Sequence, residues 1–186
     1  MVDPNTALFL LLYDSLHSQL ATLFFSTITW AGHLAFWAAV GLVLLLKDKK
    51  RPAIDLLTGA LVVIIAVQFI KYGLAVPRPF EVIPGVLPLT HDPIGGEADP
   101  SFPSGHAAMV AMGAVIVGSA YPRARPALVV LVLLVMLSRV YLGLHYPTDV
   151  LAGAVLGAAV GWAAVKLQAD NKLAEKLLKK ANRLLG

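Results

Sequence analysis

The sequence contains no cysteine among its 186 residues. This absence excludes disulfide bonds and thiol chemistry, because both require the sulfur of a cysteine side chain. It says little about the compartment in which the protein works.

Charge is also scarce. Asp, Glu, Lys and Arg make up 14% of the chain, whereas a soluble domain carries about 25%. Hydrophobic residues make up 58%. This balance excludes a soluble globular protein and predicts an all-α transmembrane helical bundle, a single integral membrane domain over residues 1–186.

The N-terminal segment lacks the basic region of a secretory signal. Asp3, and no lysine or arginine, precedes the first apolar run, so we expect no cleavable signal peptide. Residues 6–28 are apolar but include Asp14, His17 and Ser18, which are costly in the middle of a bilayer. We therefore predict an interfacial segment over 1–28, in which residues 6–28 form a helix that leads into the first span, with a sixth span as the alternative.

Five further segments are apolar enough to cross a membrane. A span needs about 20 mostly apolar residues, and we allow polar ends to reach the interface. The predicted spans are 30–46, 53–76, 104–120, 126–144 and 147–166. Together they form the predicted catalytic bundle over 29–167.

The basic residues are concentrated in particular loops. Those that follow the first, third and fifth predicted spans are Lys47, Lys49, Lys50, Arg51, Arg123, Arg125, Lys166, Lys172, Lys176, Lys179, Lys180 and Arg183. By the positive-inside rule this side is the cytoplasm. The net charge of +4 therefore indicates topology and not nucleic-acid binding. Lys71, Arg78 and Arg139 remain on the opposite, external face.

Two features belong to the C-terminal third. Residues 168–186 place apolar side chains on one helical face and lysines on the other, which predicts an amphipathic cytoplasmic tail. Gly153, Gly157 and Gly161 recur at a spacing of four, which lets a neighbouring helix approach closely. We expect this packing to lie within the bundle and the protein to be a monomer.

The long connection over 80–102 is rich in Pro and Gly. Long loops in compact domains are usually lids, binding loops or disordered segments. Because this loop joins two segments of the candidate site, we predict a rim or lid.

The first of three polar segments on the external face ends the second predicted span with Lys71 and Arg78. Snorkelling to the interface would explain one lysine. Two cations on the side that the positive-inside rule disfavours need a further reason, and a bound anion supplies it.

The second segment is PSGH at 103–106. Pro103 and Ser104 suit the start of a helix. The free N–H groups there attract an anion, and Gly105 lets an oxyanion approach the backbone. Capping explains Ser104, but it does not explain His106, because a histidine inside a span is costly unless it has a function.

The third segment is SRVYLGLHYPTD at 138–149. Arg139 lies near the end of the fourth predicted span, and His145 and Asp149 are four residues apart, so they can share one helical face. A carboxylate that accepts from one ring nitrogen fixes the tautomer and leaves the other nitrogen free to act. Taken singly these residues have structural explanations, but together beside three cations they indicate catalysis.

Two histidines, an orienting carboxylate, three cations and a helix N-terminus suit a tetrahedral oxyanion. We predict phosphoryl transfer through a phosphohistidine, in which one histidine attacks phosphorus and the other protonates the leaving oxygen. The residues alone leave open which histidine attacks. Carboxylates are scarce here and the surrounding charge is positive, so we expect no metal and no other cofactor.

The three segments resemble the three-part motif of the type-2 phosphatidic acid phosphatase superfamily. The matching positions, in the family's order, are Lys71-x6-Arg78-Pro79, Pro103-Ser104-Gly105-His106 and Ser138-Arg139-x5-His145-x3-Asp149. The resemblance implies a metal-independent phosphatase in the cell (plasma or inner) membrane, with its active site on the external or periplasmic face.

The resemblance also implies roles for individual residues. His145 is the nucleophile, Asp149 orients it, and His106 is the general acid for the leaving group and later the base for water. The implied phosphate ligands are Lys71, Arg78, Ser104, Gly105 and Arg139. His17, His33 and His91 belong to none of the motifs and are interpreted as structural.

Small prokaryotic members of this family act on lipid phosphates and diphosphates. The resemblance therefore implies a lipid phosphate substrate, with a polyprenyl diphosphate such as undecaprenyl diphosphate first and phosphatidylglycerol phosphate next. Two alternatives remain, namely a lipid phosphotransferase with the same site and a non-catalytic lipid-phosphate binder that uses only the cations.

Overall fold

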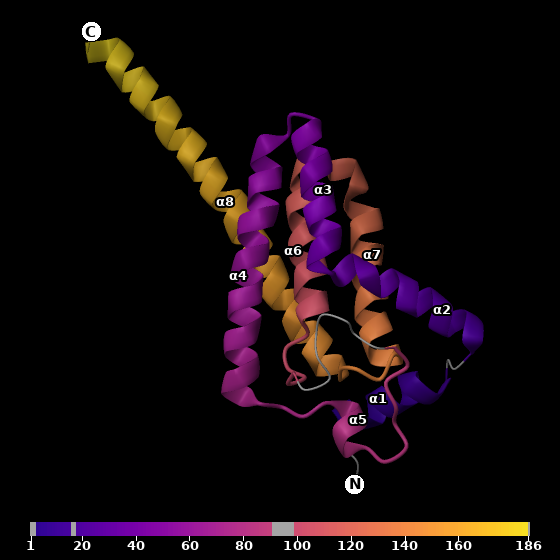
Figure 1. Cartoon of the computed structure of the whole chain (residues 1–186). Coiled ribbons are helices and arrows are strands. Elements are labelled where there is room, and N and C mark those ends of the chain that lie inside the picture. The colour runs from indigo at the N-terminus through magenta and orange to yellow at the C-terminus, as the bar shows by residue number, and fades with distance from the viewer. Residues whose placement is uncertain (1–2, 16–17, 91–98, 186) are drawn as a thin grey trace.

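The computed structural model describes residues 3–15, 18–90 and 99–185, and side chains only as far as Leu167. Every regular element in these ranges is a helix, as the composition predicts (Figure 1). The α-helices are α1 (Pro4–Ser15), α2 (Gln19–Ile28), α3 (Leu34–Leu46), α4 (Lys50–Leu74), α5 (Pro79–Val82), α6 (Gly105–Ala120), α7 (Arg125–Tyr141) and α8 (Pro147–Leu185). The short 3-10 helices are η1 (Thr29–Gly32) and η2 (Pro122–Ala124).

The helix ends follow local chemistry. α4 ends where Ala75 adopts a left-handed φ of 48°, and Pro77 follows, which cannot donate to a continuing helix. Ser104 caps α6 by accepting from the backbone N–H of Ala107. Pro147 occupies the first turn of α8, where its missing N–H is not needed.

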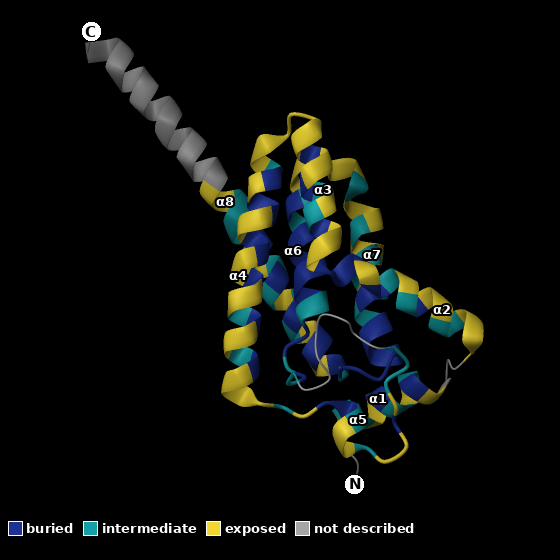
Figure 2. Ribbon diagram, viewed as in Figure 1, coloured by how far each residue is buried: buried dark blue, intermediate teal, exposed yellow. Residues whose placement is uncertain are grey.

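α6 is the central helix and packs against α4, α7, α8 and η1. Figure 2 shows α6 mostly buried, while the outward faces of α3 and α4 are exposed. On α4 these exposed side chains are apolar, for example Leu61 at 59% and Phe69 at 81% exposure. An apolar outer surface of this kind is what lipid contact requires.

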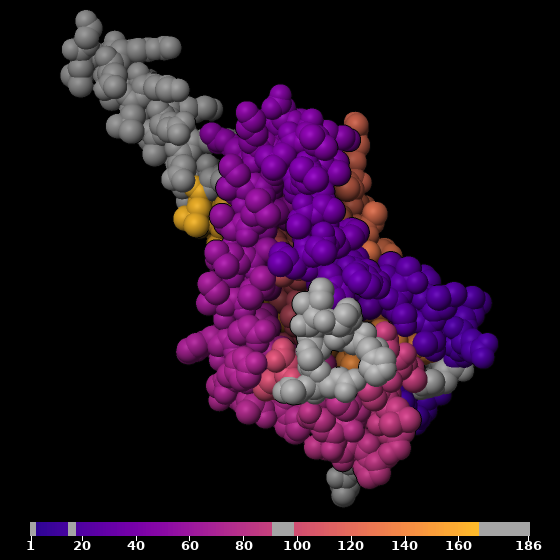
Figure 3. All heavy atoms as spheres, viewed as in Figure 1, coloured from indigo at the N-terminus to yellow at the C-terminus, as the bar shows by residue number. Residues whose placement is uncertain are grey.

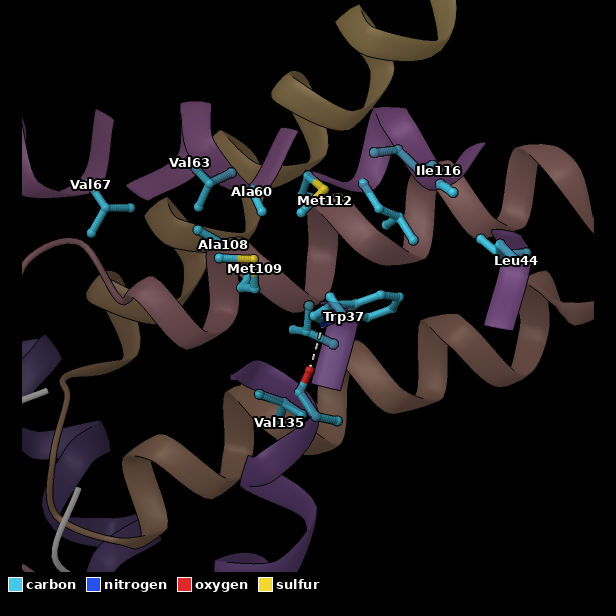
Figure 4. Close-up of a cluster of buried hydrophobic side chains, with 14 residues drawn as sticks. Trp37, Leu44, Ala60, Val63, Val67, Ala108, Met109, Met112, Ile116 and Val135 are labelled. Carbon is cyan, nitrogen blue, oxygen red and sulfur yellow. Dashed lines mark hydrogen bonds between the residues drawn. The ribbon is translucent and has the colours of Figure 1, made fainter. Parts of the chain in front are cut away.

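The core fills the space between α3, α4, α6 and α7 (Figure 4). Trp37 of α3 is 2% exposed and its indole N–H donates to the carbonyl of Ala31 at 2.8 Å. Gly113 makes room for that ring, because a Cβ there would lie 2.3 Å from it. At one end of this core Val67 lies next to Gly105, so the packed interior leads directly to the start of α6.

The glycine row of α8 packs against α6, as predicted. A Cβ on Gly153 would lie 2.3 Å from the carbonyl oxygen of Ser104, and one on Gly157 would lie 1.9 Å from that of Ala108. The glycines of α8 therefore allow its close packing against α6 within the bundle.

The predicted N-terminal helix is wrong in one respect. Instead of one helix over 6–28, the structure has α1 and α2, which are bent by 117° relative to one another. Ser18 begins the second helix by accepting from the N–H of Ala21. A capping serine in the middle of the apolar segment is the physical reason for the break.

The predicted number of five or six spans stays a prediction. Among the described residues, the segments long and apolar enough to cross a membrane are Lys50–Val82, Pro122–Tyr141 and Pro147–Leu167, and the bent α1–α2 pair adds a fourth if it is one span. α3 has 13 residues and α6 has 16, fewer than the about 20 that a span needs.

The C-terminal segment continues α8 as one helix to Leu185. The predicted amphipathic faces of 168–186 lie outside the described side chains. The part of the long connection over 91–98, which contains His91, and the position of His17 also lie outside the described residues.

Candidate active site

A cavity of about 140 Å³ lies at the end of α6 where that helix begins. Figure 3 shows the surface hollowed between α4 and the start of α3, with α6 behind. The polar residues that line the cavity are His33, Gln68, Lys71, Arg78, Asp99, His106, Arg139 and His145, together with the backbone of Gly105. Six of the eight sequence-predicted site residues therefore line one cavity, although they come from three separate segments.

The two cations of the first motif are buried and fixed by the end of the long connection. Lys71, in the last turn of α4, is 4% exposed and donates to the carbonyl of Pro100. Its Nζ lies 3.9 Å from Oδ2 of Asp99. Arg78, which precedes α5, is 2% exposed and donates through Nε to the carbonyl of Asp99 at 2.7 Å. Both positive side chains are thereby held at the cavity wall.

The start of α6 presents backbone donors to the same cavity. Ser104 is fully buried, its hydroxyl caps the helix, and its N–H donates to the carbonyl of Asp149 at 3.0 Å. Gly105 and His106 line the cavity and Ser104 lies directly before them, so the role of Ser104 as a phosphate ligand stays a prediction. Helix N-terminal N–H groups and the helix dipole favour an anion at this position.

Arg139 brings the third cation from the last turn of α7. It is 1% exposed and donates to the hydroxyl of Thr29 at 3.1 Å. Its own carbonyl accepts from the N–H of Leu144 at 3.1 Å, which closes the turn that carries His145. A buried guanidinium with fixed partners is well suited to bind phosphate oxygens.

His145 and Asp149 lie together, but not on one helical face. His145 precedes α8, whose first residue is Pro147. The Nδ1 atom of His145 lies 3.5 Å from Oδ2 of Asp149, and both side chains are 2% exposed. The turn between α7 and α8 therefore achieves the contact that we predicted from helical spacing.

Ser101 lies between these two side chains. Its hydroxyl donates to Oδ2 of Asp149 at 2.5 Å and lies 3.3 Å from Nδ1 of His145. The backbone N–H of Tyr146 donates to the same carboxylate oxygen at 2.9 Å. Because Nδ1 faces Asp149 and Ser101, the Nε2 atom is the one available for chemistry on the cavity side.

The electrostatic environment keeps His145 neutral. His145 lies outside the membrane-spanning segments, and burial, followed by the positive charges of Arg139, Arg78 and Lys71, lowers its pKa well below the ordinary value of 6.5. A neutral imidazole is the nucleophilic form.

Sequence reasoning missed four residues that contact the predicted site: Thr29, His33, Asp99 and Ser101. Ser101 and Asp99 belong to the long connection, which we predicted to be a rim or lid. Its described end contributes to the wall of the cavity through Asp99 and anchors Ser101, whose N–H donates to the carbonyl of Val76 at 2.7 Å. Their position immediately before the PSGH segment was the available signal.

The arrangement can bind a tetrahedral anion between three cations and a helix N-terminus, with one histidine to attack it and another nearby. In the part of the chain that the structure describes, no three His, Asp or Glu side chains gather as metal ligands. The donors that line this cavity are cationic and suit an anion.

Known proteins resemble this chain in sequence. The model of the PAP2 superfamily matches residues 52–173. An undecaprenyl-diphosphatase of Sulfolobus acidocaldarius is 33% identical over 147 residues, which are 77% of this chain and 69% of that protein.

Two solved structures share the fold. The crystal structure of Aquifex aeolicus LpxE has a TM-score of 0.73 at 27% identity and covers 89% of this chain and 96% of its own. A transmembrane PAP2 type phosphatidylglycerolphosphate phosphatase from Bacillus subtilis has a TM-score of 0.74 at 23% identity, covering 89% and 85%. The second likeness is one of fold alone.

Proposed function

The chain belongs to the PAP2 superfamily and is a membrane lipid phosphatase of that family, as its three motifs predicted; from this premise we propose that it removes the terminal phosphate of a polyprenyl diphosphate through a phosphohistidine on His145. One observation supports this most strongly. The buried His145, with Asp149 and Ser101 at its Nδ1 atom, lines the same cavity as His106 and three cations.

In the first step the Nε2 atom of His145 attacks phosphorus, and the bond between phosphorus and the leaving oxygen breaks. Lys71, Arg78, Arg139 and the N–H groups at Gly105 bind the remaining phosphoryl oxygens and stabilise their charge. His106 gives its proton to the leaving oxygen. The product in the site is the phosphorylated His145.

In the second step water attacks the phosphohistidine. His106, now neutral, accepts the proton of that water, the bond between phosphorus and nitrogen breaks, and inorganic phosphate is released. Asp149 holds the same ring orientation through both steps and stabilises the positive charge that develops on the imidazole.

The cavity also supports a lipid substrate. Its volume of about 140 Å³ suits a head group, and its mouth opens between α4 and the start of α3, next to exposed apolar side chains such as Ile64 at 37% and Leu34 at 44%. A phosphate can therefore enter while its tail stays in lipid. The likeness to the undecaprenyl-diphosphatase favours a polyprenyl diphosphate, and phosphatidylglycerol phosphate is the second candidate.

The distribution of charge supports an external site in the plasma or inner membrane. Lys47 and Lys49 lie in the connection from α3 to α4, at the opposite end of α4 from Lys71, and Arg123 lies in η2 after α6. Positive loops remain in the cytoplasm, and this supports a cavity on the external side. The glycine row of α8 is occupied by α6, which supports a monomer.

The test is phosphate release by purified protein in detergent from a polyprenyl diphosphate, phosphatidylglycerol phosphate, phosphatidate and a water-soluble phosphate ester. We expect the polyprenyl diphosphate to have the highest kcat/KM, and turnover to continue with a chelator present. His145→Ala is expected to lose activity roughly 10³-fold or more, as removal of a nucleophile does, while it still binds the lipid phosphate. Full turnover by His145→Ala would contradict the mechanism.

The same assay separates the two alternatives. The terminal phosphate of the substrate is radiolabelled for this purpose. A phosphotransferase would pass that phosphate to an added lipid acceptor in place of water, so the label would appear in lipid. A non-catalytic binder would bind the lipid phosphate without release from either wild type or His145→Ala. We expect free phosphate with and without the acceptor.

A further inference from the structure

His33 lies against the proposed general acid. Its ring centroid is 4.5 Å from that of His106, with the two planes at 77°. On its other side His33 contacts the Trp30 ring at 4.7 Å between centroids and 35° between planes. Trp30, His33 and His106 therefore form a row of rings that ends in the cavity, which His33 and His106 both line.

Helix capping does not explain why residue 33 is a histidine. His33 is the N-cap residue of α3, but its side chain makes no capping hydrogen bond. It is 6% exposed, and a buried ionisable group in a membrane protein is costly unless it has a function. The ring contacts of His33 with Trp30 and His106 show which side chains it faces.

The backbone before His33 also contacts His106. A Cβ on Gly32 would lie 2.7 Å from both Cβ and Cδ2 of His106, so η1 and His106 are in direct contact. The glycine permits this approach, and the His33 ring covers the adjacent part of the same imidazole. Together they leave His106 little freedom to turn about the bond that joins its ring to Cβ, a torsion that is otherwise broad.

We propose that His33 is a positioning residue that fixes the ring orientation of His106 for proton transfer to the leaving oxygen. The proposal rests on the function proposed above, in which His106 is the general acid. A proton donor must lie within hydrogen-bond distance of the oxygen that it protonates, and a displacement of about 1 Å can cost on the order of 10²-fold in rate. His33 acts through His106 and has no proton-transfer role of its own.

The test compares two substrates that carry the same alkyl chain. An alkyl phosphate has a poor leaving group that needs a proton, whereas a nitrophenyl phosphate has a good leaving group that departs without one. We expect His33→Ala to lower kcat/KM for the alkyl phosphate about 10- to 100-fold and to change kcat/KM for the aryl phosphate by less than about threefold. This ratio reports the steps up to the phosphohistidine, in which His106 is the acid, and excludes the later step, in which His106 activates water for both substrates.

A conservative variant and a control separate positioning from damage to the fold. His33→Phe keeps a ring against His106 and should recover most of the alkyl phosphate activity. Leu34→Ala removes a neighbouring side chain from the same cavity wall and should affect the two substrates by the same factor. Melting temperature and gel-filtration profile in detergent are measured for each variant.

A double-mutant cycle with His106→Ala completes the test. If His33 acts through His106, the double variant has the activity of His106→Ala alone. Equal losses on both substrates in His33→Ala, no recovery in His33→Phe, or additive losses in the double variant would each overturn the proposal. If His106→Ala itself shows no dependence on the leaving group, the general-acid assignment fails instead, and the two failures are thereby distinguished.

Discussion

The protonation state of His145 decides whether its imidazole can attack phosphorus. Burial and the nearby Arg139, Arg78 and Lys71 lower the pKa of His145 well below 6.5, so the neutral form persists as the pH falls through 6.5. We expect the acidic limb of kcat/KM, which reports the free enzyme, to have its midpoint below 6.5. The measurement is a pH–rate profile corrected for the ionisation of the substrate phosphate, which phosphorus NMR gives separately.

The same lowered pKa has a consequence for folding. The unfolded chain binds a proton on this histidine near pH 6.5, whereas the folded chain binds it only at lower pH. The contribution of the neutral His145 to the free energy of unfolding is therefore fully present above pH 6.5 and is lost as the pH falls through the pKa of His145 in the folded protein. An acidic limb of the rate profile with its midpoint at 6.5 or above would contradict the assignment of a neutral, buried nucleophile.

Ser101 is the residue that joins Asp149 to His145. Ser101→Ala removes a buried hydroxyl from the carboxylate and frees the imidazole to rotate, and we expect kcat to fall on the order of tenfold, since hydrogen bonds to charged groups contribute about 1.5–3 kcal/mol. Steady-state assays of kcat and KM provide the measurement. Ser138→Ala is the matched control, because that equally buried hydroxyl donates to Val135 in its own helix. An equal loss in both variants would show that Ser101 has no special role.

The motif residues could be predicted because their chemistry is unusual in an apolar chain. A histidine one residue inside a span and three cations on the external face each needed an explanation, and a phosphate site supplied one explanation for all of them. Ser101 and His33 could not be found in this way. Serine is common in loops and a lone histidine has no spacing signal, so their roles depend on contacts that only the packing of η1 and the long connection creates.

The close approach of α6 and α8 makes a specific prediction about stability. A Cβ on Gly157 would lie 1.9 Å from the Ala108 carbonyl oxygen, and neither helix backbone can yield without losing other contacts. Gly157→Ala is expected to destabilise the protein by about 1–3 kcal/mol, as overpacking does, with a lower melting temperature in detergent. In Gly73→Ala nothing lies within 4 Å of the added Cβ, so that variant should melt at or slightly above the wild-type temperature. Equal melting temperatures would show that α8 can move away from α6.

Most helix ends could be predicted to within a few residues, since Ser104, Pro147 and the prolines after α4 mark them chemically. The division of the N-terminal segment into α1 and α2 was not predicted, whereas α6 begins within one residue of the predicted span over 104–120 and ends with it. Hydropathy reports whether a segment is apolar, but it does not report whether that segment faces lipid or other helices. A helix that is surrounded by protein, as α6 is, need not have the full length of a span.

The orientation of the whole molecule remains a prediction, and the absence of cysteine makes it directly testable. Single cysteines can be placed at the two ends of the bundle without a background of native thiols: Lys47→Cys in the exposed connection between α3 and α4, and Val82→Cys at the end of α5, where the side chain is 52% exposed. The positive-inside rule keeps Lys47 and its basic neighbours in the cytoplasm. A membrane-impermeant maleimide should therefore label Val82→Cys in intact cells, and Lys47→Cys only after the membrane is permeabilised. The reverse pattern would place the cavity in the cytoplasm, and the external lipid phosphate would then be excluded as its substrate.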